Sequence, residues 1–391
     1  MKLNIYLLLL LLSMLALPSL NYAFSSSGLK DKKDVEDSLA FKTSSAITLD
    51  QVVDAIADKR VIYIGEIHNR YEHHLVQLYI IEALHKRGIN LAIGMEMFER
   101  QQQQALDDYI AGTIDERTFL KQSRYFEVWN IDYTLYKDII DFAKNNRIPI
   151  IGLNIDRRII SKVSKEGISS LSDEEKQKLP LQIDLSDQKY KKWLEKVFEQ
   201  HNGSGKLDNF YQAQVLWDES MAESANNFMN NNPNRTIVIL AGGGHIAYES
   251  GIPSRLYRRN KMPYATVVNA TGEELGKGVA DFIIFPKEVP APASPKFMIS
   301  VSEIDGHVKI IDFLPESVSK KAGLKKNDII LSLDGTKIES LNDLKIGLLY
   351  KNINDSVNVE IQRKRFLLPD KTILFNIPLA PPPSPKGERV H

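Results

Sequence analysis

The sequence predicts an α/β fold: a mainly parallel sheet with helices on both faces and a helical insertion, followed by a small β-rich domain. Three observations predict it. Short apolar runs alternate with amphipathic segments between residues 47 and 270, a Pro-rich stretch interrupts this pattern at 286–296, and short alternating strands follow. Because 43% of the 391 residues are hydrophobic, the chain can bury a large core.

The composition excludes several classes of function. Fifty Lys and Arg balance fifty Asp and Glu, so no net positive charge favours a nucleic-acid partner. The absence of cysteine excludes disulfides, thiolate metal sites, thiol nucleophiles and a lipid-modified cysteine, so the chain is not expected to be a lipoprotein. No Gly-x-Ser-x-Gly motif occurs, which argues against a serine hydrolase.

The N-terminus has the layout of a secretory signal. Lys2 precedes an apolar run over 5–17, and the small residue Ala23 follows at a suitable distance for cleavage. A retained anchor is the alternative, but the run is shorter than the ~20 residues that span a bilayer. We therefore expect a signal peptide over 1–23, a disordered lead-in over 24–45, and an exported protein, periplasmic or associated with the outer membrane on its periplasmic side.

The strands of the first domain, expected over 46–285, are nearly continuous apolar runs. Such runs are typical of parallel strands that are buried on both faces. A long stretch over 164–232 carries helical patterns of its own and is interpreted as a helical insertion. The expected strands are 61–64, 91–93, 148–153, 236–240 and, more weakly, 264–268, and the expected helices include 72–86, 188–201 and 210–229.

The second domain is expected over 297–379, after a stiff linker at 286–296. Asp334-Gly335 stands between two apolar runs and predicts a hairpin turn. Ser340 with Asp343 forms a capping box for a helix that extends to Tyr350. The tail at 380–391 is Pro-rich and is expected to be disordered.

Polar side chains follow the strong strands of the first domain. Glu66 and His68 come after the first strand, Glu96 after the second, Asn154 after the third and His245 after the fourth. Because the carboxyl ends of parallel strands lie along one edge of a sheet, these side chains are expected to converge. Such a set can hold a metal or carry out acid–base chemistry. The alternative is that each histidine is a hydrogen-bonded structural residue.

Other candidates lie on helices. His73 and His74 open the first helix, and helical geometry directs only one of them into the cleft. Gln214 and Asp218 form a polar face on the insertion, for which a solvated helix face is the alternative. The aromatic group Tyr125, Trp129, Tyr133 and Tyr136 has a spacing that is more typical of a core.

Several segments resemble one known family. GEIHNRYEHHLVQ, GMEMFERQQQQAL, YQAQVLWDESMA and AGGGHIAYESGIPSRL resemble the ChaN-like haem-binding proteins, which are grouped with Tiki-type metalloproteases and erythromycin-esterase-like enzymes. The resemblance covers residues 47–269. The paired Gly-x-x-His motifs of that superfamily match Gly65 to His68 and Gly242 to His245, with Glu96 as the additional glutamate.

The resemblance implies a binding protein for haem iron, held by a tyrosine in an exposed cleft, with two haems facing one another across a homodimer. Tyr133 and Tyr136 are the candidate ligands, because a phenolate suits ferric iron. The other side chains expected to line the site are His74, Asn154, Gln214 and Asp218. The alternative is a metal-dependent peptidase or hydrolase, in which a divalent metal held by Glu66, His68, Glu96 and His245 activates water.

The second domain resembles a bacterial PDZ module. AGLKKNDIILSLDG matches the core motif of such modules, with Asn327 where glycine is commoner. The resemblance implies that a peptide or a protein C-terminus binds as an added strand beside the helix at 341–350. The loop at 297–300 lacks the usual glycine, so a PDZ used for docking or dimerisation is the alternative. A scaffold in which only this module acts is a third interpretation of the whole chain.

Overall fold

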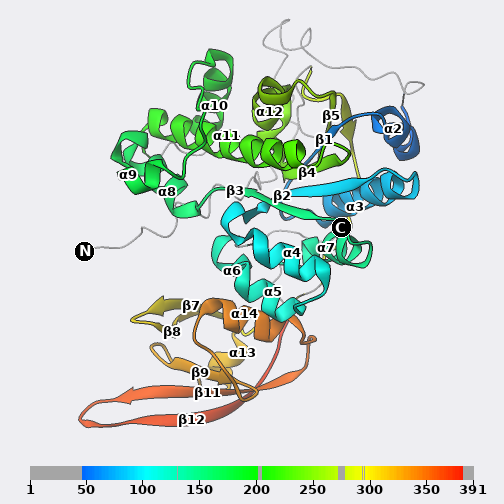
Figure 1. Ribbon diagram of the computed structural model, residues 1–391. Coiled ribbons are helices and arrows are strands. Elements are labelled where there is room, and N and C mark those ends of the chain that lie inside the picture. Colours follow the sequence, from blue (N-terminus) through cyan, green and yellow to red (C-terminus); the bar gives the residue numbers. More distant parts are fainter. Residues whose placement is uncertain are drawn as a thin grey trace, which may run out of the picture. The chain divides into compact units, whose positions relative to one another are not determined.

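The computed structural model describes residues 46–129, 131–200, 205–271, 278–292, 294 and 296–381 (Figure 1). The expected signal peptide, the whole of the expected lead-in and residues 382–391 of the tail lie outside this part of the chain. Two compact units are present: one comprises the chain up to Ala111 together with Ile131–Pro290, and the other comprises Gly112–Asn130 and the chain from Ala291 onward. None of the helices in the described residues has the length and apolar character that a membrane span requires.

The first unit is built on a six-stranded sheet in the order β3-β2-β4-β1-β5-β6, and every neighbouring pair is parallel. This confirms the predicted α/β fold. The sequence did not predict β6, which has three residues and is too short to show a pattern. The strands are β1 (Val61–Glu66), β2 (Leu91–Glu99), β3 (Ile150–Asn154), β4 (Thr236–Gly242), β5 (Tyr264–Asn269) and β6 (Phe282–Ile284).

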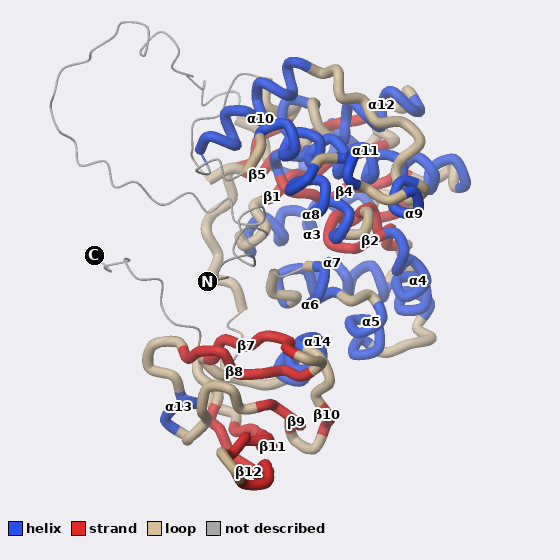
Figure 2. The backbone as a smooth tube through the Cα atoms, turned by 90° about the vertical axis from the view of Figure 1, so that its left-hand side faces the viewer, coloured by secondary structure: helices blue, strands red, loops and turns tan. Residues whose placement is uncertain are grey.

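Helices cover both faces of this sheet (Figures 1 and 2). On one face, Val61 and Tyr63 of β1 share a core cluster with Met221 of α11 and Leu256 of α12. Helices α3 and α7 pack together on the opposite face. The helices of this unit are α2 (Leu49–Ile56), α3 (Tyr71–Lys86), α4 (Gln103–Ala111), α7 (Thr134–Asn145), α8 (Arg157–Glu166), α9 (Asp173–Lys176), α10 (Gln188–Gln200), α11 (Leu207–Asn231) and α12 (Ile252–Asn260).

The second unit contains an antiparallel sheet in the order β12-β11-β9-β8-β7, with β10 paired to β9. Asp334 and Gly335 both have left-handed backbones (φ 47° and 77°), so the predicted hairpin turn is confirmed. The predicted capping box of Ser340 and Asp343 is present as well. The elements are β7 (Ile299–Ile304), β8 (His307–Phe313), α13 (Val318–Lys321), β9 (Ile329–Leu333), β10 (Thr336–Lys337), α14 (Leu341–Leu349), β11 (Ser356–Arg365) and β12 (Leu368–Pro378).

Two short helices from the middle of the chain also belong to the second unit. They are α5 (Glu116–Gln122) and α6 (Tyr125–Val128), and both pack against α14. Lys121 Nζ lies 3.0 Å from a carboxylate oxygen of Asp343, and the Tyr350 hydroxyl donates to Glu116 over 2.7 Å. This grouping was not visible in the sequence, where both helices fell inside the expected first domain.

Candidate functional site

A fully buried carboxylate stands at the carboxyl end of β1. His68 Nδ1 donates to Glu66 Oε1 over 2.9 Å, and the Tyr136 hydroxyl donates to the same oxygen over 2.7 Å. Gln77 Nε2 donates to Oε2 over 2.7 Å, and His74 Nδ1 lies 3.2 Å from that oxygen. Strand β1 ends at Glu66, so His68 lies in the following turn and its ring reaches back to the strand end. We call these five residues the Glu66 cluster.

Glu66 and His74 shift each other's pKa in opposite directions within the Glu66 cluster. Burial alone would raise the pKa of Glu66, but His74 and His68 outweigh burial and hold this pKa far below its usual range. Burial alone would lower the pKa of His74, but the Glu66 carboxylate outweighs it and raises that pKa. Both ring nitrogens of His74 face acceptors, because Nε2 lies 3.1 Å from the His68 carbonyl oxygen, so a protonated ring that pairs with the Glu66 carboxylate fits this site.

The adjacent histidine has the opposite charge state. Burial and the neighbouring charge of His74 lower the pKa of His73 to about 4, so its ring is neutral at pH 7. Its Nδ1 accepts the backbone N–H of Ile67 over 3.0 Å and fixes the turn after β1. As expected for consecutive helix residues, only one of the two histidines joins the carboxylate.

A second group, which we call the His245 cluster, gathers at the ends of β2 and β4. His245 Nδ1 donates to Asp218 over 2.7 Å, and its Nε2 lies 3.5 Å from Glu96. The Tyr190 hydroxyl, from α10, donates to the other oxygen of Asp218 over 2.5 Å. Burial alone would lower the pKa of His245, but the carboxylates of Glu96 and Asp218 outweigh it and raise this pKa to about 9. His245 is consequently a cation at neutral pH.

The two clusters adjoin at Gly242. Its N–H donates to Glu96 over 2.7 Å. A Cβ at this position would lie 3.0 Å from Cε1 and 3.1 Å from Nε2 of His68, so a side chain here would displace the imidazole. The structure thus brings Glu66, His68, Glu96 and His245 together at the carboxyl edge of the sheet, across 177 positions between the two histidines (245 − 68).

The remaining polar candidates hold the framework of this edge. Asn154 is buried and donates to the backbone carbonyl of Glu96 over 3.0 Å, so it positions β2. Asp218 and Gln214 are both buried on α11, which makes the alternative of a solvated helix face wrong. Asp218 belongs to the His245 cluster, whereas Gln214 lies one turn earlier on the same helix.

The two candidate tyrosines are not in an exposed cleft, which corrects the expectation drawn from the resemblance. Tyr133 and Tyr136 are fully buried. The Tyr136 hydroxyl is bonded to Glu66, and its ring centroid lies 4.3 Å from that of His74. The physical reason is that the start of α7 packs against α3, so this aromatic group belongs to the core.

A tyrosine that was not among the predicted site residues lies in the loop after β4. Tyr248 is partly exposed and has a left-handed backbone (φ 56°), as does Glu249 beside it (φ 56°). The N–H of Tyr248 donates to Val279 over 2.8 Å. Gly251 closes the loop: a Cβ there would lie 2.1 Å from the His245 carbonyl oxygen. The signal in the sequence was the position of a tyrosine three residues after the second Gly-x-x-His motif.

Aromatic side chains surround this loop. The ring of Trp193, from α10, lies 6.3 Å from that of Tyr248, and the ring of Trp217, from α11, lies 5.3 Å from that of His245. The indole N–H of Trp217 is buried without a hydrogen-bond partner. A phenol, flat aromatic walls and an unpaired donor are suited to a flat aromatic ligand that carries hydrogen-bond acceptors.

The same edge of the sheet is less suited to binding a metal ion. Within the described ranges, no group of three or more histidine, aspartate or glutamate side chains is arranged to hold a metal. Glu66 and His68 face one another, and so do Glu96 and His245, with their lone pairs and protons used in these contacts. The structure therefore gives no support to the divalent metal of the alternative interpretation.

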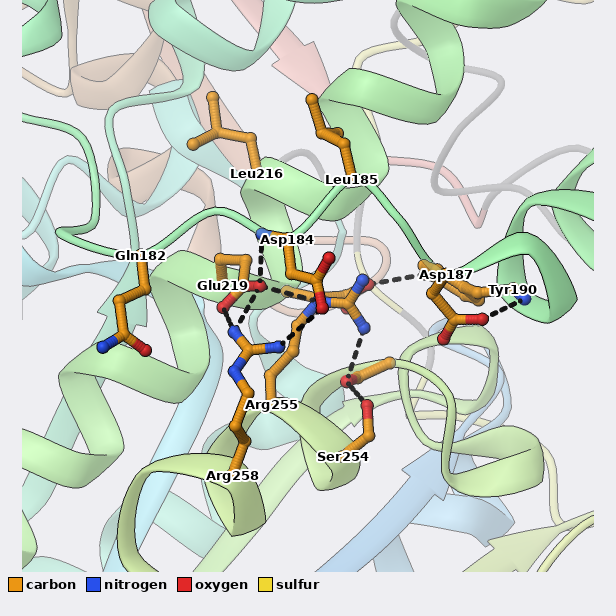
Figure 3. A network of polar contacts seen from close by, with 12 residues as sticks. Gln182, Asp184, Leu185, Asp187, Tyr190, Leu216, Glu219, Ser254, Arg255 and Arg258 are labelled. Carbon is orange, nitrogen blue, oxygen red and sulfur yellow. Dashed lines mark hydrogen bonds and ion pairs between the residues drawn. The ribbon is translucent and has the colours of Figure 1, made fainter.

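A third group of buried polar side chains lies beside the His245 cluster, and its carboxylate is paired with arginines instead of histidines (Figure 3). Glu219, next to Asp218 on α11, accepts from Arg258 over 2.7 Å and lies 2.7 Å from Arg259. Arg255 donates to the carbonyl oxygens of Ser250 and Gly251 and stacks over the Tyr190 ring at 4.8 Å. This Glu219 network holds α11, α12 and the loop after β4 together.

Comparisons with known proteins follow this division of the chain. The model of a family described as haem-binding uptake, Tiki superfamily, ChaN, matches residues 52–256, and a PDZ domain model matches residues 295–377. The solved structure of ChaN of Campylobacter jejuni with cofacially bound haem is similar in fold, with a TM-score of 0.50 and 21% identity. It covers 62% of this chain and 92% of its own chain.

Two further proteins are similar over parts of the chain. Protein RETICULATA-RELATED 5, chloroplastic, of Arabidopsis thaliana is 20% identical over 284 residues, which is 61% of this chain and 36% of that protein. The chain thus spans about a third of the length of this curated relative. The HtrA3 PDZ domain bound to a phage-derived ligand is 17% identical with a TM-score of 0.19 and covers 22% of this chain and 86% of its own.

Proposed function

Because the chain belongs to the ChaN family of haem-binding uptake proteins in the Tiki superfamily, we propose that it binds haem at the carboxyl edge of its parallel sheet. The observation that carries this location is Tyr248, a partly exposed phenol on a left-handed backbone beside His245. The chain is proposed to be exported and to act in haem or iron uptake.

Tyr248 is the proposed iron ligand in place of Tyr133 and Tyr136. When bound, haem would supply a ferric iron, and the Tyr248 phenolate oxygen would hold it as a hard ligand. A left-handed backbone at a residue other than glycine costs on the order of 1 kcal/mol, and two such residues in sequence are kept where a particular side chain must be presented. The loop closure at Gly251 and the bond to Val279 hold Tyr248 in that conformation.

The neighbours of Tyr248 suit the rest of the haem. Trp193 and Trp217 offer apolar aromatic surface for the porphyrin ring. The Trp217 indole N–H, which is buried without a hydrogen-bond partner, is a donor for a propionate. In this arrangement the Glu66 cluster does not touch the iron and instead positions the strand ends.

The PDZ module is proposed to dock a peptide or a protein C-terminus. Strand β7 is the edge of its sheet and α14 lies beside it, which is the arrangement for adding a peptide strand. Glu303 on β7 accepts the N–H of Leu341 over 2.6 Å and joins β7 to the start of α14. A homodimer with facing haems is part of the proposal, in line with the cofacial haems of the Campylobacter protein.

Haemin titration of the purified protein, combined with elemental analysis, tests the proposed function. We expect a saturable shift of the Soret band and no stoichiometric divalent metal. A protein that leaves the haemin spectrum unchanged contradicts the proposal. Stoichiometric divalent metal together with cleavage of peptides would instead establish the hydrolase alternative.

A further inference from the structure

The hairpin of β11 and β12 ends in an apolar tip. Phe366 is 89% exposed, Leu367 is 88% exposed and Leu368 is 58% exposed. The two strands extend together as an arm whose turn lies beyond the end of β9 (Figure 1). Three consecutive large apolar side chains in water are unfavourable unless another surface covers them.

The backbone of the tip indicates that these side chains are not there to form the turn. Arg365 pairs with Leu368, so Phe366 and Leu367 are the two turn residues. Leu367 has a left-handed backbone (φ 56°), a conformation in which glycine or asparagine is favoured. A leucine at this position therefore strains the fold while its side chain contacts solvent.

Positive charge surrounds the apolar tip. Lys364, Arg365 and Lys371 are exposed beside it, against the single acid Asp370, which gives a local charge of +2 (3 − 1). Arg365 Nε donates to the carbonyl of Pro369 over 2.8 Å, which keeps this guanidinium close to the turn. Bulky apolar side chains within a ring of cations are the features that bind an anionic lipid surface.

We propose that the β11–β12 tip inserts into an anionic membrane surface. The tip offers only three large apolar side chains, whereas a stable protein interface buries about 1,200–2,000 Å². The charge matches lipid phosphates, and the apolar side chains match the acyl boundary beneath them. The inference does not depend on haem binding, and it gives a chain without cysteine a route to a membrane.

Vesicle sedimentation of the protein without residues 1–23 tests the proposal. That apolar segment would bind lipid by itself, and neither unit contains any of it among its described residues. The probe is vesicles of equal parts phosphatidylglycerol and phosphatidylethanolamine, with phosphatidylcholine vesicles as the uncharged comparison. We expect binding to the anionic vesicles that salt weakens.

The variants Phe366→Ser and Leu367→Asn are each expected to reduce partitioning about tenfold, because each removes one apolar side chain from the lipid. Asparagine tolerates the left-handed backbone, so Leu367→Asn should preserve or raise the melting temperature. Leu374→Asn is the matched control: this residue is 66% exposed on β12, away from the turn, and its replacement should leave partitioning unchanged.

The charge is tested separately. Lys364→Gln and Lys371→Gln should each lower binding to the anionic vesicles about fivefold and leave phosphatidylcholine unaffected. Equal binding of the unaltered protein and Leu367→Asn would overturn the proposal, as would binding that ignores lipid charge. A lower sedimentation mass of Phe366→Ser than of the unaltered protein, measured without vesicles, would show that the tip covers a second copy of the chain and would also overturn the proposal.

Discussion

Two carboxylates of the first unit, Glu66 and Glu219, are both buried, but their hydrogen-bond and ion-pair partners differ in chemical type. Glu66 is surrounded by histidine, tyrosine and glutamine, whereas Glu219 is surrounded by arginines from α12. Arginine stays protonated at every pH at which the protein is folded, so the cations of the Glu219 network keep their charge. At the sheet edge the pKa of His73 is lowered to about 4 and that of His245 is raised to about 9, so the charge there changes with pH. We therefore interpret the Glu219 network as structural and the sheet edge with its histidines as the candidate site.

The largest effect is expected from Glu219→Ala. The change leaves Arg255 and Arg259 buried without their carboxylate, and the loss in unfolding free energy should be about 3–5 kcal/mol. Urea unfolding measures it. Glu223→Ala on the same helix is the control: Glu223 pairs with the part-exposed Arg100, so its loss should be about 1 kcal/mol. Equal losses for the two variants would remove the basis for calling the Glu219 network structural.

Glu66→Gln should lower the unfolding free energy by less than Glu219→Ala does, by about 2–3 kcal/mol near pH 6. The size of this loss should depend on pH. The lowered pKa of Glu66 stabilises the fold above about pH 4.5, and this contribution is lost as the pH falls through the folded-state pKa. The raised pKa of His74 stabilises the fold below about pH 6.5, and this contribution is lost as the pH rises through its folded-state pKa.

The difference between Glu66→Gln and the unaltered protein should therefore be largest between about pH 4.5 and 6.5 and narrow on either side. For Glu219→Ala the arginine partners contribute no pH dependence in this range. Unfolding measured over a pH series checks both. A flat profile for Glu66→Gln would show that His74 is not its ion-pair partner.

Asp218→Asn keeps the shape of the side chain and removes one of the two carboxylates facing His245. The pKa of His245 should fall from about 9 toward its ordinary value, with a loss of about 1–2 kcal/mol below pH 6.5 that disappears as the pH rises through about 9. An NMR titration of the histidine ring protons measures the shift. An unchanged pKa would mean that Glu96 alone sets the charge.

The smallest effect is expected from Tyr136→Phe. Only one hydrogen bond to Glu66 is lost, and the carboxylate keeps its bonds to His68 and Gln77, so the loss should be about 1 kcal/mol. Thermal unfolding measures it, with Tyr63→Phe, a fully buried tyrosine of β1, as the comparison for removing a hydroxyl elsewhere in the core. If the haem spectrum also changed, Tyr136 would act on the iron and not only on Glu66.

The sheet and its polar edge could be predicted because each of its strands except the short β6 carries its own signal. An apolar run that is followed at once by Glu66 or by Gly-Gly-Gly-His245 marks both a buried strand and the point where it ends. Parallel connection then places those ends together without further information. The same reasoning predicted the Asp334-Gly335 turn and the Ser340 cap, which are local features of a few residues.

The features that the sequence did not reveal depend on contacts or backbone angles without a periodic pattern. Nothing in the spacing of Tyr133 and Tyr136 distinguishes a buried hydroxyl from one in a cleft. The left-handed backbone of Tyr248 is set by the return of Gly251 to His245, which no local propensity encodes. The pairing of Lys121 with Asp343 joins residues that are 222 positions apart (343 − 121).

The central claim is that Tyr248, and neither buried tyrosine, holds the haem iron. The most direct test is the visible spectrum of the ferric haem complex of Tyr248→Phe, beside Tyr136→Phe and the half-exposed control Tyr257→Phe of α12. We predict that the phenolate-to-iron charge-transfer band disappears only in Tyr248→Phe. If that band persists in Tyr248→Phe, or is lost in Tyr136→Phe instead, the account of this site is contradicted.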